Sequence, residues 1–520
     1  MKILQNFKTI TFAFFLILGL TQSGYAALVD MAEYQDWNGV ESSISTEDIN
    51  ATQPDGMSAL FWAVYYEEAD IVSLLLDAGA DANVQNRYGL TPLIQSSITG
   101  NGEIISMLLD AGADANARTL QGDTALMNAA KAGSVQGVQA LIEAGADVEA
   151  RDGYSFQSPL MWAAAFNQAE IVRILAENGA DVNARSAELI FSGIQQGGVQ
   201  GDFPNGGLTS LHHAARENGV ETVEVLLALG ANPSAVDPQG ISPLRVAATN
   251  ENLDIAKILI EGGANLNDGS LVDIMEIPYK RFAFQHAASN YDNQTTVAEL
   301  TLMMIEMGAD LDAMSEIGIP VFSTGFVGEK GPEGESALFR AALGDRMEDV
   351  ALLLENGANV NALSEEGNTA LGAVLNVYTG FRPPDPTRDK RIEPTFEEKI
   401  PMVDLMFEYG ADVNTVVGTG GTILHQAAEL GEDEIVAMLI AKGIDLSIKD
   451  DSNRTALDVA SGVEPIDKPE DMNPLGYPEE TPIYETTIAI LTEAMNEQGI
   501  AIEEYVAPPS VEGEEESTEA

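Results

Sequence analysis

The side chains that most often perform catalysis or hold metal ions are scarce in this sequence. It contains no cysteine and four histidines, at positions 212, 213, 286 and 425. Thiolate metal sites, iron–sulfur clusters and cysteine nucleophiles are therefore excluded. No two histidines stand four residues apart, and the HExxH, GxSxG, GxGxxG and phosphate-loop motifs are absent. We predict no enzyme activity, no cofactor and no metal ion, and the catalytic alternative is an enzyme whose site lies in inserted loops.

Carboxylates are the one abundant kind of reactive side chain, with 82 Asp and Glu against 25 Lys and Arg. They are too numerous for any two of them to be nominated as an acid–base pair. Asp-x-Asn runs such as Asp181-Val182-Asn183 lack the glycine and the distal glutamate of a calcium-binding loop. We therefore interpret these runs as loop caps, and weak calcium binding at the surface stays open.

The charge also restricts the partners, since the formal net charge is −57. A surface this acidic repels phosphate backbones and anionic membranes, so we expect no nucleic-acid binding. It favours cations or basic surfaces as partners, and acidity that serves only solubility is the alternative. The 520 residues are 45% hydrophobic, which provides ample apolar material for a large core.

Residues 1–26 have the pattern of a secretory signal peptide. Two lysines supply positive charge, residues 10–20 are apolar, and Gly24-Tyr25-Ala26 offers a small-residue cleavage site. We expect cleavage after Ala26, with an uncleaved membrane anchor as the alternative. No later stretch approaches the ~18 apolar residues of a membrane-spanning helix, so no membrane insertion is expected after cleavage. The lack of cysteine fits export to a bacterial periplasm, and secretion beyond it stays open.

The rest of the chain repeats a short phrase, Gly-Ala-Asp or Gly-Ala-Asn, with a degenerate last copy. The copies begin at Gly79, Gly112, Gly145, Gly179, Gly230, Gly263, Gly308, Gly357, Gly410 and Gly443. Their spacing is 33 or 34 residues where it is regular and 45 to 53 residues where it is lengthened. A fixed period of this kind indicates a repeat architecture, and the lengthened intervals mark insertions.

A second phrase, Ser or Thr and usually Ala or Pro followed by Leu, opens each unit. Its clear copies begin at Ser58, Thr91, Thr124, Ser158, Thr209, Ser242, Ser336, Thr369, Thr422 and Thr455, and a blurred copy stands at 282–284. Ser or Thr predicts a helix N-cap, and proline at the first helical position needs no amide partner. Apolar residues at helical spacing predict a second helix, and the glycine of the first phrase predicts its left-handed C-cap.

The period, the two phrases and their order resemble the ankyrin repeat over about residues 29–494. The resemblance implies an all-α solenoid of stacked helix-turn-helix units with hairpin-loop fingers. It further implies that the first helices and the finger tips line a concave binding face. His212 and His425 occupy the position of the family's structural histidine.

The repeats also set the expected domain boundaries. We expect an N-terminal capping repeat at 27–57, ankyrin repeats at 58–461 and an interrupted C-terminal capping unit at 462–497. The acidic segment 498–520 has too little apolar surface to order itself, so we expect a disordered tail.

Insertions interrupt the repeats at 186–207, 315–335 and 377–396. The first two are apolar fingers that either contact a partner or fold back over their own repeats. The third overlaps the stretch Arg382–Lys399, in which basic, acidic and proline residues alternate. It is either a clamp for an acidic partner or a tie to neighbouring acidic helices, and its role stays open.

Aromatic residues gather in the first repeats, at positions that the resemblance assigns to the concave face. They are Trp62, Tyr65, Tyr66, Tyr88, Tyr154, Phe156, Trp162 and Phe166. Aromatics make up only 6% of the chain and are enriched at interface hot spots, so we predict that these eight side chains contact a partner. For Trp62 and Trp162, packing between repeats is an equal alternative.

The sequence therefore predicts a non-catalytic protein–protein interaction scaffold in the bacterial cell envelope. The alternative is a periplasmic accessory or stress-protective factor for another enzyme, which would use the same surface to a different end. Neither the partner nor the oligomeric state follows from the sequence.

Overall fold

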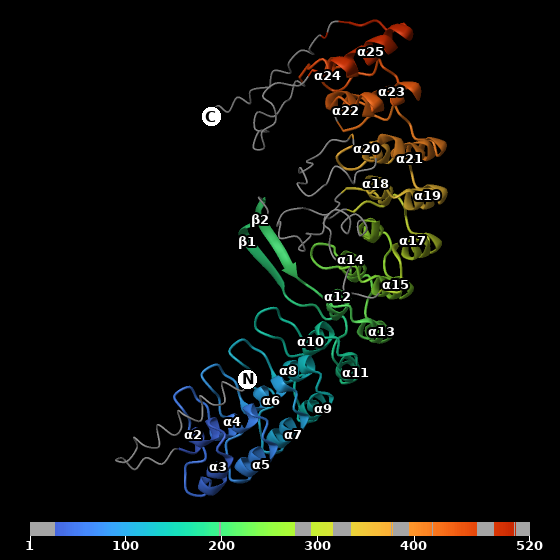
Figure 1. The fold of residues 1–520 in the computed structure, drawn as a ribbon. Helices are drawn as coiled ribbons and strands as arrows, with labels where there is room; N and C mark the ends of the chain where they lie inside the picture. The colour runs from blue at the N-terminus through green and yellow to red at the C-terminus, as the bar shows by residue number, and fades with distance from the viewer. Residues whose placement is uncertain are drawn as a thin grey trace, which may run out of the picture. The chain divides into compact units, whose positions relative to one another are not determined.

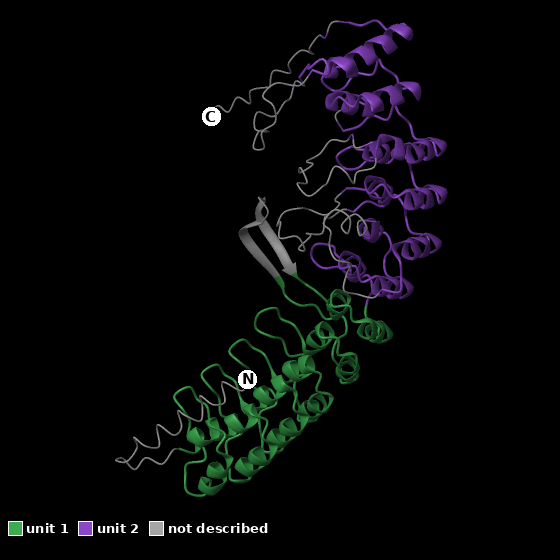
Figure 2. Ribbon diagram, viewed as in Figure 1, with its two compact units in different colours: residues 1–189, 206–231 green, residues 190–205, 232–520 purple. Residues whose placement is uncertain are grey.

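The computed structural model describes residues 27–196, 199–275, 293–315, 334–375, 377, 395–418, 420–464, 483–503 and 505. The chain divides into two compact units (Figure 2). Unit 1 comprises Met1–Leu189 and Gly206–Ala231, and unit 2 comprises Ile190–Asn205 and Asn232–Ala520.

Unit 1 is a series of helix pairs (Figure 1). The first helices are α2 (Leu28–Glu33), α4 (Ala59–Tyr65), α6 (Pro92–Thr99), α8 (Ala125–Ala132), α10 (Pro159–Ala165) and α12 (Ser210–Arg216). The second helices are α3 (Trp37–Ser43), α5 (Ala69–Asp77), α7 (Gly102–Asp110), α9 (Val135–Glu143), α11 (Ala169–Glu177) and α13 (Val220–Ala228). First helices pack on first helices and second helices on second helices, so the unit has two helical layers.

Local chemistry explains where these helices begin and end. The Ser58 hydroxyl accepts from the amide of Phe61 at 3.1 Å, and the Thr91 hydroxyl accepts from the amide of Ile94 at 3.2 Å. Each bond satisfies an amide that has no partner inside the helix. Gly79 follows α5 with φ +90°, a left-handed conformation that L side chains rarely adopt. The predicted N-caps and glycine C-caps are confirmed at these positions.

Between the two layers lies an apolar core built from small and branched side chains. Ala129 and Ala130 of α8 are fully buried, and they allow the neighbouring first helices to approach closely. Leu175 of α11 and Leu226 of α13 are likewise fully buried. Each repeat therefore depends on its neighbours for its core, as stacked repeats do.

A row of side-chain amides joins consecutive repeats at the ends of the second helices. The Asn83 side chain accepts from the amide of Asp114 at 2.7 Å and donates to the carbonyl of Gly112 at 3.0 Å. Asn50 and Asn116 make the same two bonds one repeat earlier and one repeat later. The Asp-x-Asn runs thus cap their own loops through Asp and tie each repeat to the next through Asn.

The insertion at 186–207 forms a two-stranded sheet, in which β1 (Glu188–Gln196) pairs with β2 (Val199–Gly206). Backbone bonds close its base, from Ser186 to Leu208 at 2.9 Å and from Gly207 to Ala187 at 3.0 Å. The insertion was expected to form a finger, but its two β-strands were not expected in an all-α solenoid.

Unit 2 continues the same helix-pair architecture. Its helices are α14 (Pro243–Thr249), α15 (Leu253–Glu261), α17 (Val297–Glu306), α18 (Ala337–Leu343), α19 (Met347–Glu355), α20 (Ala370–Leu375), α21 (Phe396–Glu408), α22 (Ile423–Leu430), α23 (Asp433–Ala441), α24 (Ala456–Ala460) and α25 (Glu485–Glu497). Residues 270–275 are also helical. The α25 helix packs on α23 and α24 and closes the last described repeat.

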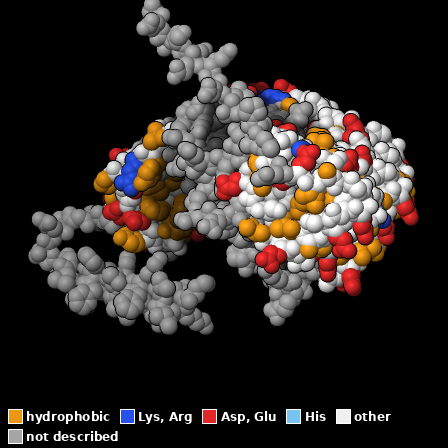
Figure 3. Space-filling model, turned by 90° about the horizontal axis from the view of Figure 1, so that it is seen from above, with side chains coloured by type: hydrophobic (Ala, Val, Ile, Leu, Met, Phe, Trp, Pro, Cys, Tyr) orange, Lys and Arg blue, Asp and Glu red, His pale blue; other side chains and the backbone are white. Residues whose placement is uncertain are grey.

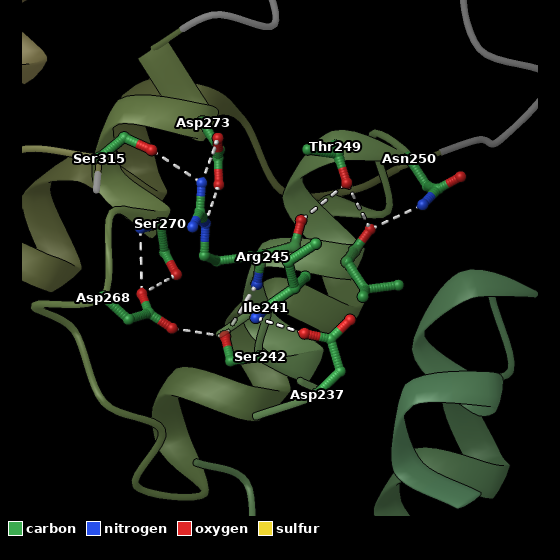
Figure 4. A network of polar contacts seen from close by, with 11 residues as sticks. Asp237, Ile241, Ser242, Arg245, Thr249, Asn250, Asp268, Ser270, Asp273 and Ser315 are labelled. Carbon is green, nitrogen blue, oxygen red and sulfur yellow. Dashed lines mark hydrogen bonds and ion pairs between the residues drawn. The ribbon is translucent and has the colours of Figure 1, made fainter. Parts of the chain in front are cut away.

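A buried polar network links α14 to the helical residues 270–275 (Figure 4). Arg245 Nε donates to Asp273 Oδ2 at 2.7 Å, and Arg245 Nη2 donates to the Ser315 hydroxyl at 2.8 Å. The hydroxyl of Ser242, the N-cap of α14, donates to Asp268 Oδ2. Charged groups this deeply buried are tolerated only when they are paired and hydrogen-bonded, as they are here.

Several expectations fall on residues that the structure does not describe. These are the signal peptide at 1–26, the blurred phrase at 282–284, most of the insertions at 315–335 and 377–396, residues 465–482 of the C-terminal unit, and the end of the tail from 506. The blurred phrase was expected to open a repeat, yet the chain is already helical at 270–275, twelve residues earlier in the sequence. Tyr505, in the tail expected to be disordered, donates to the carbonyl of Ser452 at 3.0 Å.

No helix among the described residues combines the length and apolar character needed to cross a membrane.

Candidate functional site

Four aromatic side chains form a cluster on the first helix pairs of unit 1. The rings of Trp62 and Tyr66 stack with centroids 5.9 Å apart, and Tyr65 stands edge-on to both. Trp37, which the sequence analysis passed over, packs edge-on against Tyr66 at 6.1 Å. Three of the predicted partner-binding residues are therefore brought together by α4.

Hydrogen bonds fix two of these rings to the rest of the fold and leave the third exposed. The Tyr66 hydroxyl donates to the carbonyl of Glu33 at 3.2 Å, and Trp62 Nε1 donates to Gln53 Oε1 at 3.2 Å. The Gln53 amide in turn donates to Glu33 Oε2 at 2.6 Å. Trp62 and Tyr66 are thus half-buried and tied to the capping repeat, whereas the Tyr65 side chain is exposed.

A second cluster surrounds Lys131 at the end of α8. Its ammonium lies 5.3 Å from the centre of the Trp162 ring and 4.8 Å from that of Phe166, both within cation–π range. Trp162 is half-buried, and its Nε1 donates to Asp152 Oδ2 at 3.1 Å. Phe166 is exposed. Both tryptophans therefore use their N–H group within the fold.

The loops between the helix pairs are joined to one another by backbone bonds. Leu120 donates to the carbonyl of Tyr88, Gly153 to that of Gln121, and Ala187 to that of Ser155. These loops are the fingers of the repeats, and the bonds hold their tips in register. Tyr88, Tyr154 and Phe156 are exposed on them as predicted from their loop positions.

Two rows of exposed apolar side chains result, and both contain residues that the sequence analysis missed. We call Tyr34, Tyr65, Ile98 and Phe166, at the C-terminal ends of first helices, the helix row. We call Tyr88, Leu120, Tyr154 and Phe156 the finger row. Tyr34 is 68% exposed and Leu120 is 75% exposed. Their equivalence to predicted residues in other repeats was the signal that could have found them.

Unit 2 places few aromatic side chains at these positions among its described residues, although Leu430 at the end of α22 and Leu363 and Val416 in the loops before α20 and α22 are exposed. The position seven residues after the N-cap, which holds Tyr65 in α4, holds Thr249, Leu343 and Glu429 in α14, α18 and α22. Seven described aromatic side chains are exposed, and six of them lie in unit 1, with Tyr409 the exception. The exposed aromatic surface is therefore a property of unit 1.

Charge on the described surface is mainly negative. On the face drawn in Figure 3, acidic side chains are spread widely and basic ones are few. Asp152, at the base of a finger, is buried and accepts from the amides of Tyr154 and Ser155 in addition to Trp162. Asp123, in the neighbouring finger, is half-buried, and burial together with the Asp152 carboxylate raises its pKa while Lys131 lowers it.

The described histidines are buried within the helical repeats. In α22 the amide of Thr422 donates to His425 Nδ1 at 3.0 Å, and His425 Nε2 lies 3.1 Å from the carbonyl of Arg454. A carbonyl only accepts, so Nε2 carries the proton and the ring is neutral. Burial lowers the pKa of His425 and lowers that of His213 to about 3. His286 lies outside the described residues.

Metal-binding groups do not converge in the part of the chain that the structure describes. Within it, no three His, Asp or Glu side chains come together in a way that could hold an ion.

Known proteins share this architecture. The family model for ankyrin repeats, which spans three copies, matches residues 28–119, 111–186, 188–270, 211–315 and 395–466. These matches cover more than half of the chain, and the chain therefore belongs to the ankyrin-repeat family.

Individual relatives are more distant. The chain is 30% identical over 163 residues to the B-cell lymphoma 3 protein homolog of Mus musculus, covering 31% of each chain. It is 29% identical over 239 residues to the mitochondrial disaggregase of Homo sapiens, covering 43% of this chain and 33% of the relative. It is 25% identical over 237 residues to the ankyrin repeat and SOCS box protein 16 of Homo sapiens, covering 45% and 44%.

The chain thus spans less than half the length of each of these curated relatives. Among solved structures, the human ASB11 ankyrin repeat domain is similar with 22% identity and a TM-score of 0.37, covering 48% of this chain and 98% of that domain.

Proposed function

We propose that this protein is a non-catalytic scaffold, exported from a bacterial cytoplasm, that binds another protein through unit 1. Ankyrin repeats imply protein–protein interaction, and the family membership supports the general role. The observation that carries the specific proposal is the pair of exposed apolar rows on unit 1. Monomeric surfaces rarely leave large apolar groups together in the open, and aromatic side chains are enriched at interface hot spots.

The predicted site residues have unequal parts in this proposal. Tyr65, Tyr88, Tyr154, Phe156 and Phe166 are exposed and supply contact area directly. Trp62, Tyr66 and Trp162 are half-buried, and their polar atoms bond within the fold. They hold the surface in shape and offer a partner only their remaining exposed area.

The test compares two double variants of unit 1. Tyr65→Ala with Phe166→Ala removes two members of the helix row, and truncating such anchors costs ~2 kcal/mol or more, about thirtyfold in affinity. The control, Val135→Ala with Val220→Ala, removes two exposed apolar side chains from second helices of the same unit. Cross-linking in the native envelope should capture a partner with the control and lose it with the helix-row variant. Equal capture by both variants would place the interface elsewhere.

Export is a separate part of the proposal and rests on the signal-peptide pattern of residues 1–26. The mature chain should begin at Ala27 and be recovered from the periplasm. Mass spectrometry of the native protein decides this, and an intact residue 1 in the mature protein would overturn it.

A further inference from the structure

The two apolar rows of unit 1 flank carboxylates, and one of these carboxylates has no donor. Asp152 receives three hydrogen bonds, from the indole of Trp162 and from two amides of its own finger. Asp123 lies in the finger that presents Leu120, and only its backbone groups bond, to Thr119. Among the described residues, no side chain or amide donates to the Asp123 carboxylate.

The electrostatic surroundings of Asp123 favour an additional cation. Burial and the neighbouring Asp152 carboxylate raise the pKa of Asp123, and the Lys131 ammonium only partly opposes them. Lys131 itself lies against the rings of Trp162 and Phe166 and forms no ion pair with the described residues. It is also the only lysine between positions 9 and 256. The Asp123 carboxylate, three residues after Leu120 of the finger row, is therefore only partly compensated by Lys131 and forms no ion pair with the described residues.

We infer that the helix row and the finger row of unit 1 bind a protein segment that carries Lys or Arg among apolar residues, with a basic side chain at Asp123. This inference rests on the proposed function and adds the chemistry of the partner. The apolar side chains of the segment cover Tyr65, Leu120 and Phe166, and its cation pairs with the Asp123 carboxylate. A cation fits because opposite charges at an interface steer association and suppress wrong partners.

The competing occupants fit less well. An acidic segment would meet the Asp123 and Asp152 carboxylates with like charge, which is costly at an interface. A nucleic acid would bring phosphates to a chain with 82 acidic and 25 basic residues. An acidic segment is one of the probes in the test below.

The intrinsic fluorescence of the full chain reports on this surface alone. The three tryptophans are Trp37, Trp62 and Trp162, and all of them lie in the two clusters of unit 1. Three synthetic dodecapeptides serve as probes, with alternating Arg–Leu, Arg–Ser or Glu–Leu sequence. We expect the Arg–Leu peptide to shift the tryptophan emission and to bind at least about tenfold more tightly than the Arg–Ser peptide. The Glu–Leu peptide should not bind.

Two variants of one repeat separate a specific site from general charge attraction. Asp123→Asn and Glu143→Gln each remove one negative charge, the first at the finger and the second at the exposed end of α9. Affinity for the Arg–Leu peptide should fall about tenfold with Asp123→Asn and change less than about twofold with Glu143→Gln. Circular dichroism and unfolding midpoints of both variants should match those of the unaltered chain.

Three results would overturn the inference: no binding of the Arg–Leu peptide, equal losses in the two variants, or tighter binding of the Glu–Leu peptide. The cellular cross-linking experiment keeps this failure apart from failure of the proposed function. If Asp123→Asn leaves capture intact while Tyr65→Ala with Phe166→Ala abolishes it, the basic segment is wrong and the binding surface stands. If neither variant affects capture, the proposed surface itself is wrong.

Discussion

Arg245 and Asp273 form an ion pair in the interior of unit 2, with Nε of the arginine 2.7 Å from Oδ2 of the aspartate and both side chains almost fully buried. Arg245 stands three residues after the N-cap of its helix. In α12 and α22 that position holds His212 and His425, each bonded back to its capping threonine. Arg245 instead reaches a partner 28 residues further along the chain. The Ser242 hydroxyl still caps α14 by accepting from the Arg245 amide, but the side-chain bond back to the N-cap has been replaced by a contact between neighbouring helices.

Removing one member of this ion pair should destabilise the chain far more than replacing both members with apolar residues. Asp273→Ala leaves the Arg245 charge buried without its partner, which typically destabilises a protein by about 3–5 kcal/mol. Arg245→Met combined with Asp273→Leu removes both charges, and we expect its stability to lie much closer to that of the unaltered chain. Urea unfolding followed by circular dichroism measures both effects.

Tryptophan fluorescence supplies the internal control for this experiment, because all three tryptophans belong to unit 1. The fluorescence transition should be the same in the two variants and in the unaltered chain. If Asp273→Ala costs less than about 1 kcal/mol, the buried pair is not held as described, since removing the carboxylate partner of a buried arginine should destabilise the chain by more than that.

A second prediction concerns the row of asparagine side chains that joins consecutive repeats of unit 1. Asn83→Ala removes a bond from the Asp114 amide and a bond to the Gly112 carbonyl, and it should cost about 1–2 kcal/mol. Asn83→Asp retains an acceptor but loses the donor, so its cost should be intermediate. Unfolding followed by tryptophan fluorescence measures both. An aspartate variant that is less stable than the alanine variant would contradict this account of the two bonds.

Much of the fold was predictable because its signals are local. Ser58 and Thr91 cap helices through amides three residues away, and Gly79 ends a helix through its own backbone conformation. These interactions lie within a few residues of sequence, so a repeated phrase reveals them. The helical segment 270–275 was missed because Gly269, rather than Ser or Thr, precedes it, and because Asp273 pairs with Arg245 of another helix.

The site was only partly predictable for a related reason. Exposure depends on which neighbours cover a side chain, and this is set by packing rather than by residue type. Tyr65 and Tyr66 are adjacent and chemically identical, yet one is exposed and the other stacks on Trp62 and bonds to Glu33. Leu120 was overlooked because it belongs to the finger row only through its alignment with Tyr88 on the preceding finger.

His213 should make unit 1 less stable at low pH. Burial, with smaller effects of Arg216 and His212, lowers its pKa to about 3 in the folded chain, whereas an unfolded histidine titrates near 6.5. Below about pH 6.5 the unfolded chain takes up a proton that the folded chain does not. The folded state therefore loses up to about 1.4 kcal/mol for each pH unit between these two values.

His213→Gln isolates this effect, because glutamine does not titrate. The free energy of unfolding of the unaltered chain, relative to that of His213→Gln, should fall as the pH is lowered from 7 to 4.5. Titration of the many carboxylates is common to both proteins and cancels in the difference. A difference that is flat over this range would mean that His213 is accessible to protons in the folded chain.

Tyr66 separates the structural part of the aromatic cluster from its binding part. Its ring packs against Trp37 and Trp62, and its hydroxyl bonds to the carbonyl of Glu33 in the capping repeat. Tyr66→Phe removes only the hydroxyl bond and should cost about 1 kcal/mol. Tyr66→Ala also removes the ring contacts and should cost about 3 kcal/mol, at the lower end for large aromatic truncations because the ring is half-buried.

Tyr65→Ala, which truncates an exposed ring, should cost less than about 1 kcal/mol while still weakening partner capture. Fluorescence-monitored unfolding of the three variants, set beside their capture in the envelope, measures both quantities. If Tyr66→Phe weakened capture at unchanged stability, the Tyr66 hydroxyl would face the partner and the bond to Glu33 would not form in solution.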